Sequence, residues 1–349
     1  MIEELSFVMP RHFSTCTDWT PLEPSPPLVQ IVASLTARVF VGPTLCRSPL
    51  WLSTTISYAR DVFLAAAILK QFPPMLRSTC KFLIPQIWSI RRHNRVAAKI
   101  VEEVLSYGAA EDGDATRGIW ELLPEDLRSD FDFQGRGQLG LAAAGIHTTA
   151  RLLTNAVYNL ATYPECIFAL REELERVRGE TGDSWTVEKL GKLWKMDSFL
   201  RETLRVHAGG VTAFRRKVLR PLTLSTGLHI PAGSYLSAPS SSISLDPRFF
   251  ACASTFQPWR ASDLRSSSPA ASSKQMSSID TSSLHFGLGK HACPGRFFAA
   301  VEAKLVLATL LERYDFGLQE GGERPMDRVV SGLQFPKAGV VILLKSRGS

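Results

Sequence analysis

The stretch Phe286-Gly287-Leu288-Gly289-Lys290-His291-Ala292-Cys293-Pro294-Gly295 places one thiol in a glycine-rich loop. Apolar residues recur three or four positions apart after it, at Phe298, Val301, Leu305, Ala308 and Leu311. This spacing predicts a helix that begins at Pro294, with Cys293 near its N-cap. Such a helix terminus favours a thiolate, the form of cysteine that ligates a metal. A lone cysteine is more often a small apolar residue, so both interpretations stand on these residues alone.

Three glycines of this loop, Gly287, Gly289 and Gly295, permit backbone turns that a Cβ would forbid. They also let a flat ligand approach the main chain closely. The loop is therefore suited to cradle a disc-shaped cofactor.

The composition indicates a globular chain with a basic balance. Of its 349 residues, 45% are hydrophobic, which is ample for one large domain or two ordinary ones. The net charge of +7 and pI of about 9.2 suggest an acidic partner, such as a redox protein, or an anionic membrane surface. No block of like charges and no aromatic-interleaved basic run resembles a nucleic-acid groove, so no nucleic acid is expected as a partner.

Six cysteines are scattered along the chain without a C-x-x-C pair, which predicts reduced thiols in a cytosolic environment. The longest apolar run, Val62 to Leu69, is far below the ~20 residues that a bilayer-spanning helix needs, so neither an anchor nor a signal peptide is predicted. We expect residues 61–72 to form a buried helix, with a membrane-facing patch as the alternative.

Small residues fill one helical turn in Ala142-Ala143-Ala144-Gly145, just before Ile146-His147-Thr148-Thr149. A turn without large side chains either packs another helix closely or leaves room for a flat cofactor with a small ligand above it. From the residues alone, packing is the favoured interpretation.

The remaining pattern predicts helices beside a small β-sheet. Pro164 is expected to open a helix whose Glu172, Glu173 and Glu175 face solvent. Strands are expected at Val218–Leu224, Ser234–Ser237 and Val340–Leu344, and a serine-rich surface loop over residues 263–283. Glu202 and Arg205 share one helix face, where an exposed pair is only weakly stabilising.

The loop around Cys293 matches Phe-x-x-Gly-x-His/Arg-x-Cys-x-Gly at every fixed place, and it thereby resembles the haem-binding signature of the cytochrome P-450 family. The resemblance implies haem b as cofactor and Cys293 as the proximal iron ligand. It implies cofactor contacts from Phe286, Gly287, Gly289, His291, Gly295, Arg216, Ala144 and Gly145. Of these, His291 and Arg216 would contact the haem propionates, with ordinary surface cations as the alternative.

Two further motifs support the resemblance. Ala144-Gly145-Ile146-His147-Thr148-Thr149 is similar to the family's distal-helix motif, with His147 in place of the usual acid. This makes Thr148 the candidate for proton delivery, through its hydroxyl and a water, and His147 the next. Glu202 and Arg205 resemble the family's Glu-x-x-Arg, and Arg260 in Phe256-Gln257-Pro258-Trp259-Arg260 would complete a buried triad that holds the Cys293 loop in register.

The resemblance implies a mostly helical α+β haem-thiolate fold in a single, incomplete catalytic domain over residues 1–349. The implied activity is a monooxygenase that inserts one oxygen atom from O2 into an apolar small molecule. Similarity to fungal secondary-metabolite members points to a terpenoid or alkaloid substrate. Electrons would come from NADPH through NADPH–cytochrome P-450 reductase, with cytochrome b5 as a second donor, to a monomeric chain.

The resemblance covers only the C-terminal part of a usual family member, so we expect an N-terminally truncated chain without the anchor, first strands and first helices. Full-length relatives imply the cytoplasmic face of the endoplasmic reticulum membrane. Two rival interpretations stand beside the monooxygenase. One is an inactive pseudoenzyme or binding protein, and the other is a haem-thiolate isomerase or peroxide-driven oxidant.

Overall fold

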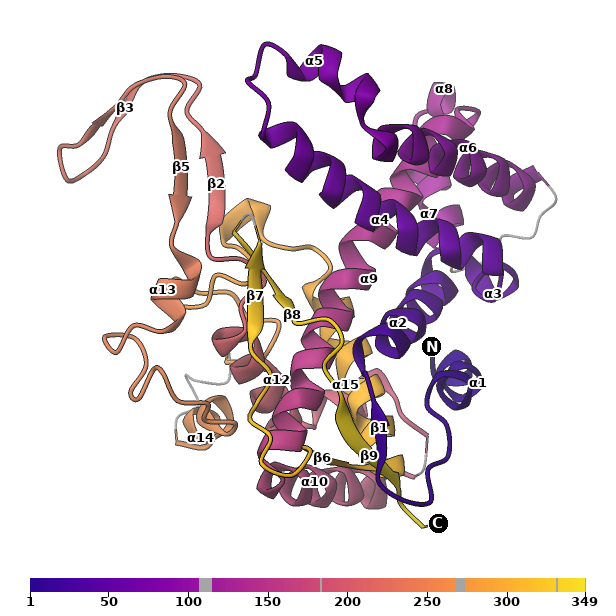
Figure 1. The fold of residues 1–349 in the computed structure, drawn as a ribbon, viewed down its shortest axis with the longest axis vertical. Helices are drawn as coiled ribbons and strands as arrows, with labels where there is room; N and C mark the ends of the chain where they lie inside the picture. The colour runs from indigo at the N-terminus through magenta and orange to yellow at the C-terminus, as the bar shows by residue number, and fades with distance from the viewer. Residues whose placement is uncertain (107–114, 183, 268–273, 331, 349) are drawn as a thin grey trace. The chain divides into compact units, whose positions relative to one another are not determined.

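The structure, a computed structural model, describes residues 1–106, 115–182, 184–267, 274–330 and 332–348. Its contacts divide the chain into two compact units (Figure 1). Unit 1 comprises Met1–Thr17 and Glu23–Arg151, and unit 2 comprises Asp18–Leu22 and Leu152–Ser349.

Every regular element in the described part of unit 1 is a helix. The elements are α1 (Ile2–His12), α2 (Ser25–Phe40), α3 (Gly42–Leu45), α4 (Pro49–Lys70), α5 (Arg77–Cys80), η1 (Lys81–Leu83), α6 (Pro85–Ser106), α7 (Ala115–Leu122), α8 (Glu125–Arg128) and the first part of α9 (Phe131–Thr162). Trp51 of α4 lies in a buried cluster with Ala37 of α2, Ile100 of α6 and Leu139 of α9. Burial of these apolar faces holds the four helices together.

Unit 2 combines helices with short strands, as expected for the predicted α+β class, which is confirmed. Its helical elements are the end of α9, α10 (Glu165–Thr181), α11 (Val187–Gly191), α12 (Trp194–Val206), α13 (Ser240–Ser244), α14 (Arg260–Ser267), η3 (Gly289–His291) and α15 (Arg296–Arg313). Its strands are β1 (Thr20–Leu22), β2 (Ala213–Lys217), β3 (Leu222–Thr223), β4 (His229–Ile230), β5 (Tyr235–Ala238), β6 (Tyr314–Gly317), β7 (Asp327–Val330), β8 (Leu333–Pro336) and β9 (Ile342–Ser346).

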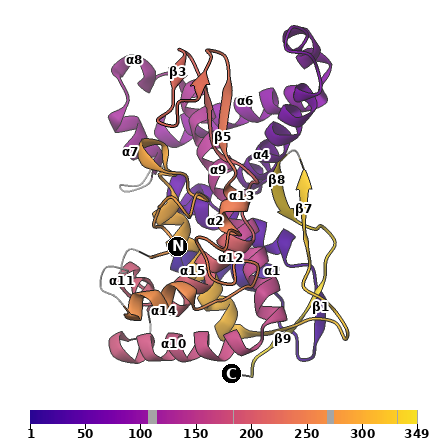
Figure 2. The same cartoon turned by 90° about the vertical axis from the view of Figure 1, so that its left-hand side faces the viewer.

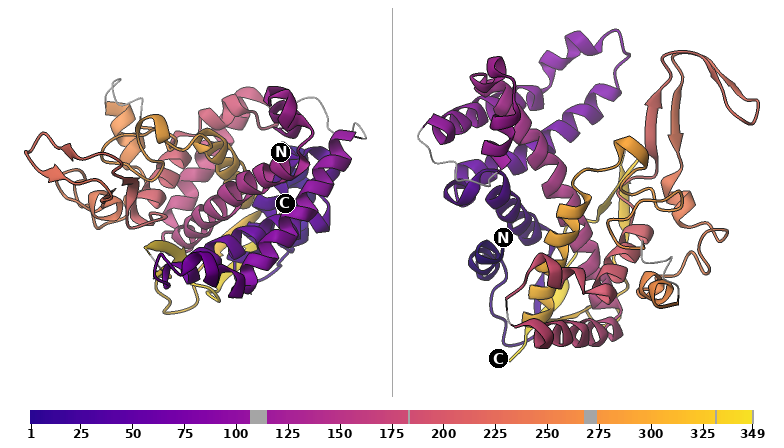
Figure 3. Two further views of the ribbon diagram at one scale, coloured as in Figure 1. Left: turned by 90° about the horizontal axis from the view of Figure 1, so that it is seen from above. Right: turned by 180° about the vertical axis from the view of Figure 1, so that it is seen from behind.

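The largest sheet of unit 2 has the antiparallel order β1-β9-β6, with Thr20 opposite Leu344 and Phe316 opposite the same residue. Three two-stranded pairs complete the β-structure: β2-β5, β3-β4 and β7-β8. The β2-β5 pair forms a long arm with β3 and β4 at its end (Figures 2 and 3).

The predicted strand at Val218–Leu224 is largely wrong. The long strand lies earlier, at β2, and pairing with β5 ends at Lys217 opposite Tyr235. Beyond it, the Val218 N–H donates to the Ser234 carbonyl and the Val218 carbonyl accepts from the Gly233 N–H, and Pro221 lacks the N–H that a continuing strand would donate. The strands predicted at Ser234–Ser237 and Val340–Leu344 are found shifted by one and two residues.

The helix predicted over residues 61–72 is found up to Lys70 as the end of α4, but the prediction that it is buried is wrong. The helix α4 begins at Pro49, and Phe63 and Leu64 remain 45% and 43% exposed. Among the described residues, α4 is the one helix that is long and apolar enough to cross a membrane by length and composition. The apolar run Val62 to Leu69 is shorter than the apolar part of the helix. Trp51, Leu52 and Ile56 continue the apolar stretch on the other side of the polar residues that precede Val62.

The serine-rich segment is only partly a loop, because residues 263–267 belong to α14. The Ser198 hydroxyl of α12 accepts hydrogen bonds from the backbone N–H groups of Ala261 and Ser262 at 3.0 and 3.1 Å. This contact satisfies donors at the start of α14 that have no partner within the helix. Residues 268–273 lie outside the described residues.

Candidate functional site

A backbone hydrogen bond closes the Cys293 loop, because the N–H of Cys293 donates to the Phe286 carbonyl at 2.7 Å. Inside this closure the N–H of Ala292 donates to the Gly289 carbonyl at 3.0 Å. Gly287 and Gly289 have φ angles of +74° and +68°, which residues with a Cβ rarely adopt. The two glycines thus permit the tight turns that bring the thiol back toward Phe286.

The helix that follows begins at Arg296 with Gly295 as its N-cap, so the predicted start at Pro294 is wrong. The Cys293 N–H is committed to Phe286, and Arg296 donates from its side chain to the Cys293 carbonyl at 2.8 Å. The loop therefore ends two residues later than the apolar spacing indicated. Cys293 precedes the helix, and a Cβ added at Gly295 would lie 3.9 Å from its sulfur.

Cys293 has properties that fit a metal ligand, and it shares its half-buried state with Cys16 and Cys80. Its side chain is half-buried, and its sulfur forms no hydrogen bond with any described residue. Burial raises the pKa of Cys46 to about 11 and that of Cys166 to about 12, so both remain thiols at neutral pH. All six cysteines are free, and of them only Cys293 lies in the glycine loop.

Arg216 and His291, the two residues expected to contact the haem propionates, both lie in unit 2. His291 is exposed at the end of η3, and Arg216 lies within β2 rather than before a strand. The Arg216 guanidinium lies 4.4 Å from the Phe214 ring, and it donates to the Arg215 carbonyl at 2.8 Å. Neither Arg216 nor His291 forms an ion pair with a described residue, which leaves both side chains able to contact an anionic group.

In unit 1, the small-residue turn of α9 has two different faces. Ala142 and Ile146 are buried against Ala33 of α2, and a Cβ at Gly145 would lie 3.6 Å from Thr36. Ala144 and Thr148, four residues apart, are exposed on another face. Helix packing thus explains one face of this turn, and the other face has room for a ligand.

His147 and Thr148 are both held by main-chain carbonyls. The His147 Nε2 lies 3.2 Å from the Ile56 carbonyl of α4, where it acts as a donor. Burial lowers the pKa of His147, so the ring is neutral at pH 7. The Thr148 hydroxyl donates to the Ala144 carbonyl at 2.6 Å and keeps its lone pairs for an incoming donor.

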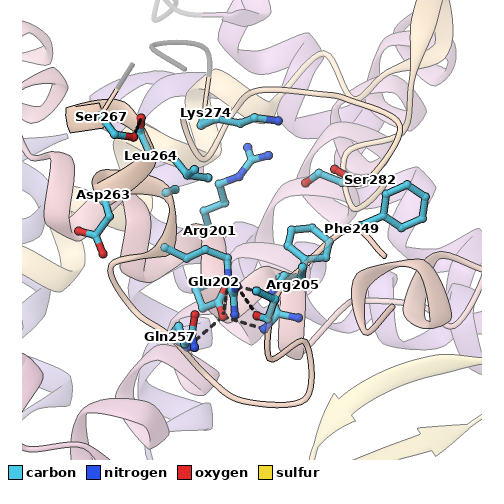
Figure 4. Close-up of a pocket in the computed structure, with 15 residues that line it drawn as sticks. Arg201, Glu202, Arg205, Phe249, Gln257, Asp263, Leu264, Ser267, Lys274 and Ser282 are labelled. Carbon is cyan, nitrogen blue, oxygen red and sulfur yellow. Dashed lines mark hydrogen bonds and ion pairs between the residues drawn. The ribbon is translucent and has the colours of Figure 1, made fainter. Parts of the chain in front are cut away.

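The structure brings Glu202, Arg205 and Arg260 together in unit 2. Figure 4 shows the Glu202 and Arg205 side chains directed toward one another. Arg205 binds both carboxylate oxygens of Glu202, at 2.7 and 2.8 Å, and Arg260 approaches to 3.2 Å. The Glu202 and Arg205 side chains are only 3% and 5% exposed. The Glu202–Arg205 pair therefore belongs to a buried network and is not an ordinary surface pair.

The triad organises the segment from Ser244 to Gln257 rather than the Cys293 loop itself. Arg205 donates to the carbonyls of Ser244, Ala253 and Thr255, and the Gln257 N–H donates to Glu202 at 2.9 Å. None of the triad's hydrogen bonds with described residues reaches 286–295. The direct clamp on the thiol loop that the motif suggested is therefore not found.

Sequence reasoning missed a second buried charge cluster around Asp197 of α12. Asp197 pairs with Lys304 of α15 at 2.6 Å and with Arg265 of α14 at 2.9 Å. It also accepts the N–H of Met276 at 2.7 Å. The cluster thus ties α15, the helix that follows Cys293, to α12 and α14.

Glu173 is a second omission, because the structure buries it to 5% exposure instead of placing it in solvent. Its carboxylate accepts the N–H groups of Lys195 at 2.7 Å and Met196 at 2.9 Å. It thereby serves the start of α12, whose N-cap residue, Leu193, has no polar side chain to do so. No spacing in the sequence links these two helices.

Comparisons with known proteins agree on one family. The cytochrome P450 family model matches residues 138–343. The monooxygenase olcJ of Penicillium canescens is 33% identical over 99% of this chain and 67% of its own length. AN1598 of Emericella nidulans is 34% identical over 99% and 66%, and ent-kaurene oxidase P450-4 of Gibberella fujikuroi is 31% identical over 99% and 70%.

A solved structure, the retinoic acid bound cyanobacterial CYP120A1, has the same fold, with a TM-score of 0.76 at 19% identity over 99% of this chain and 73% of that one. The chain spans about two thirds of the length of its curated fungal relatives, which are named as monooxygenases. The chain belongs to the cytochrome P450 family of haem-dependent monooxygenases, which receive electrons from a redox partner and act on small molecules.

Proposed function

We propose that this chain inserts one oxygen atom from O2 into an apolar small molecule of the terpenoid or alkaloid type, with Cys293 as the proximal iron ligand. The observation that carries the proposal is the closed Cys293 loop, in which two glycines with positive φ present a half-buried sulfur that has no hydrogen-bond partner among described residues. Relatives named ent-kaurene oxidase support the substrate class.

Haem, when bound with a thiolate ligand, supplies O2 activation and O–O cleavage. The chain's own residues hold and orient it. Cys293 would ligate the iron, and Gly287, Gly289 and Gly295 would let the ring approach the main chain, beside Phe286. Arg216 and His291 would contact the propionates, because neither side chain forms an ion pair with a described residue. NADPH would supply the electrons through its P450 reductase, with cytochrome b5 as a second donor.

Ala144, Gly145 and Thr148 would serve the side where substrate and protons enter. Ala144 and Thr148 are exposed on α9, and Gly145 adds no side chain beside them. Thr148 donates to the Ala144 carbonyl, so its oxygen can accept a hydrogen bond from a water and fix that water in place. His147 is neutral and donates a hydrogen bond to the Ile56 carbonyl. Its first role would therefore be to attach α9 to α4, and proton donation would be secondary.

Labelled oxygen gas tests the reaction class. The chain reconstituted with haem, NADPH and reductase is given terpenoid hydrocarbons, ent-kaurene among them, under ¹⁸O2. We expect a product that carries one ¹⁸O atom, measured by mass spectrometry. An unlabelled rearranged product would identify an isomerase, and turnover with hydrogen peroxide alone would identify a peroxide-driven oxidant. Failure of the chain to take up haem would identify a pseudoenzyme.

Replacing Thr148 by valine tests its role in proton supply. Insertion of one oxygen atom consumes two electrons and two protons and releases the second atom as water. Valine keeps the shape of threonine but removes the hydroxyl, so reduced oxygen should leave more often as hydrogen peroxide. We expect product per NADPH consumed to fall several-fold, with haem content unchanged.

The matched control is Thr148→Ser, which retains the hydroxyl and should stay close to the wild type. Product, NADPH and peroxide are measured in the same reaction. Full coupling in Thr148→Val would show that protons reach the site by another route.

A further inference from the structure

A polar network lies inside unit 2, between α9 and α12. Asn155 and Asn159 lie one turn apart on α9, Thr203 lies on α12, and all three are 0% exposed. Asn159 donates from its Nδ2 to the Thr203 hydroxyl at 3.0 Å, and this hydroxyl donates to the Phe199 carbonyl at 2.8 Å. Buried amides are costly unless their oxygens accept hydrogen bonds. The two asparagine oxygens are therefore strong anchors for a donor from another segment.

Arg324, in the loop between β6 and β7, supplies such donors. Its Nε donates to the Asn159 Oδ1 at 2.6 Å, and its Nη2 donates to the Asn155 Oδ1 at 2.8 Å. These two nitrogens form one edge of the planar guanidinium, which the single ammonium of a lysine cannot reproduce. Burial lowers the pKa of Arg324, and the charge of Asp327 opposes that shift. Arg324 thus attaches the loop before β7 to α9.

A second contact attaches the first residue of β7. The Nδ1 of His207, at the end of α12, lies 3.1 Å from the Asp327 Oδ2. The two side chains are only 13% and 7% exposed. Since Arg324 and Asp327 are three residues apart, the start of β7 is held by both α9 and α12. These attachments fix one end of the β7-β8 pair.

The other end of the β7-β8 pair contacts the segment that leads from α12 to β2. The Val211 N–H donates to the Gly332 carbonyl at 3.0 Å, and the Gln334 N–H donates to the Gly209 carbonyl at 3.2 Å. A Cβ added at Gly332 would lie 3.4 Å from the Val211 side chain and 3.6 Å from the Arg215 guanidinium. The residue before β8 therefore packs closely against the start of β2.

The start of β2 needs such support because the strand is irregular. Its register with β5 shifts between Ala213 and Arg216, and Phe214 has a φ of +58°, which is uncommon for a residue with a Cβ. Such a conformation persists only where the surrounding structure holds it. The packing of Arg215 against Gly332 is one of the contacts that do so.

We propose that Arg324 is a positioning residue for haem binding, which acts through the β7-β8 pair. The inference rests on the proposed function, in which Arg216 contacts a haem propionate. Arg324 holds the start of β7, the β7-β8 pair extends from there to Val211 and Arg215, and Arg215 directly precedes Arg216. Because its donors are used by α9, Arg324 itself would contact neither haem nor substrate. Its loss should weaken haem retention by releasing Arg216.

Two measurements on the haem-loaded 349-residue chain test the proposal. Haem retention is measured as the rate of haem transfer to apomyoglobin, and local order as hydrogen exchange of the peptides that contain Val211 and Gln334. Arg324→Ala should speed both about tenfold, since it removes charged hydrogen bonds from buried partners. Arg324→Lys keeps the charge without the planar fork, so its rates should lie between those of Arg324→Ala and the wild type. If Arg324→Ala does not fold, Arg324→Lys provides the comparison.

Removal of Arg216 separates the positioning role from a general loss of stability. If Arg324 acts through Arg216, the double variant Arg324→Ala with Arg216→Ala should lose haem no faster than Arg216→Ala alone. Equal acceleration by Arg324→Ala with and without Arg216 would overturn the proposal, because Arg324 would then have only a structural role. Unchanged exchange at Val211 in Arg324→Ala would also overturn it.

The matched control is Arg328→Ala, at an exposed arginine of β7 whose side chain forms no hydrogen bond or ion pair with a described residue. It should match the wild type in both measurements, and far-UV circular dichroism checks that every variant is folded. A normal rate of haem loss in Arg216→Ala would contradict the proposed propionate contact. Exchange at Val211 would then decide by itself whether Arg324 holds this segment.

Discussion

The Cys293→Ala protein is expected to lose the thiolate-type Soret band of the reduced carbon monoxide complex and all monooxygenase activity. The thiolate is the proposed axial ligand, and alanine offers no donor in its place. The sulfur has no hydrogen-bond partner among the described residues, so the substitution removes no polar contact that the fold needs. Far-UV circular dichroism should therefore remain that of the wild type while the spectrum changes.

Two other cysteines provide the controls for this experiment. Cys252→Ala changes an exposed thiol, and Cys46→Ala changes a buried one whose raised pKa of about 11 keeps it protonated. Both proteins should retain the thiolate spectrum. A retained thiolate band in Cys293→Ala would show that another residue ligates the iron and would contradict the assignment.

The Glu202→Ala protein is expected to lose most of its stability. The change leaves Arg205, 5% exposed, and Arg260, 12% exposed, without their carboxylate, and it strands the Gln257 N–H. Breaking a buried ion network by removing one partner costs about 3–5 kcal/mol. Since a domain's net stability is about 5–15 kcal/mol, we expect poorly soluble or haem-free protein. Urea unfolding and haem content measure the effect.

The chain offers a matched control in the Arg176–Glu180 pair, whose N–O distance of 2.8 Å is close to the 2.7 Å of Arg205–Glu202. Its side chains are 55% and 46% exposed. Glu180→Ala should therefore cost no more than about 1 kcal/mol. Similar losses in the two variants would mean that burial adds nothing to the Glu202 network.

The sequence predicted well what lies close together in the chain. The turns of the Cys293 loop follow from Gly287 and Gly289, whose positive φ angles need no distant partner. The Glu202–Arg205 pair follows from helical spacing. Arg260 was found only because a motif linked it to these two residues, since nothing in residues 256–260 shows that they reach α12.

Contacts between distant segments could not be predicted. Glu173 is charged, so its sequence position predicts that it faces solvent. Only the position of α12 shows that it is buried. Asp197, Arg265 and Lys304 come from three helices. The start of α15 moved because the Cys293 N–H is used by the loop.

The pairing of β1 with β9 makes the three-stranded sheet of unit 2 a late product of folding. Thr20 lies opposite Leu344, so this sheet joins two segments that are 324 positions apart in the sequence. Contacts between such distant positions are slow to form because loop closure must precede any gain from pairing. The local pairs β2-β5 and β7-β8 close much shorter loops, so they are expected to form before β1 joins β9.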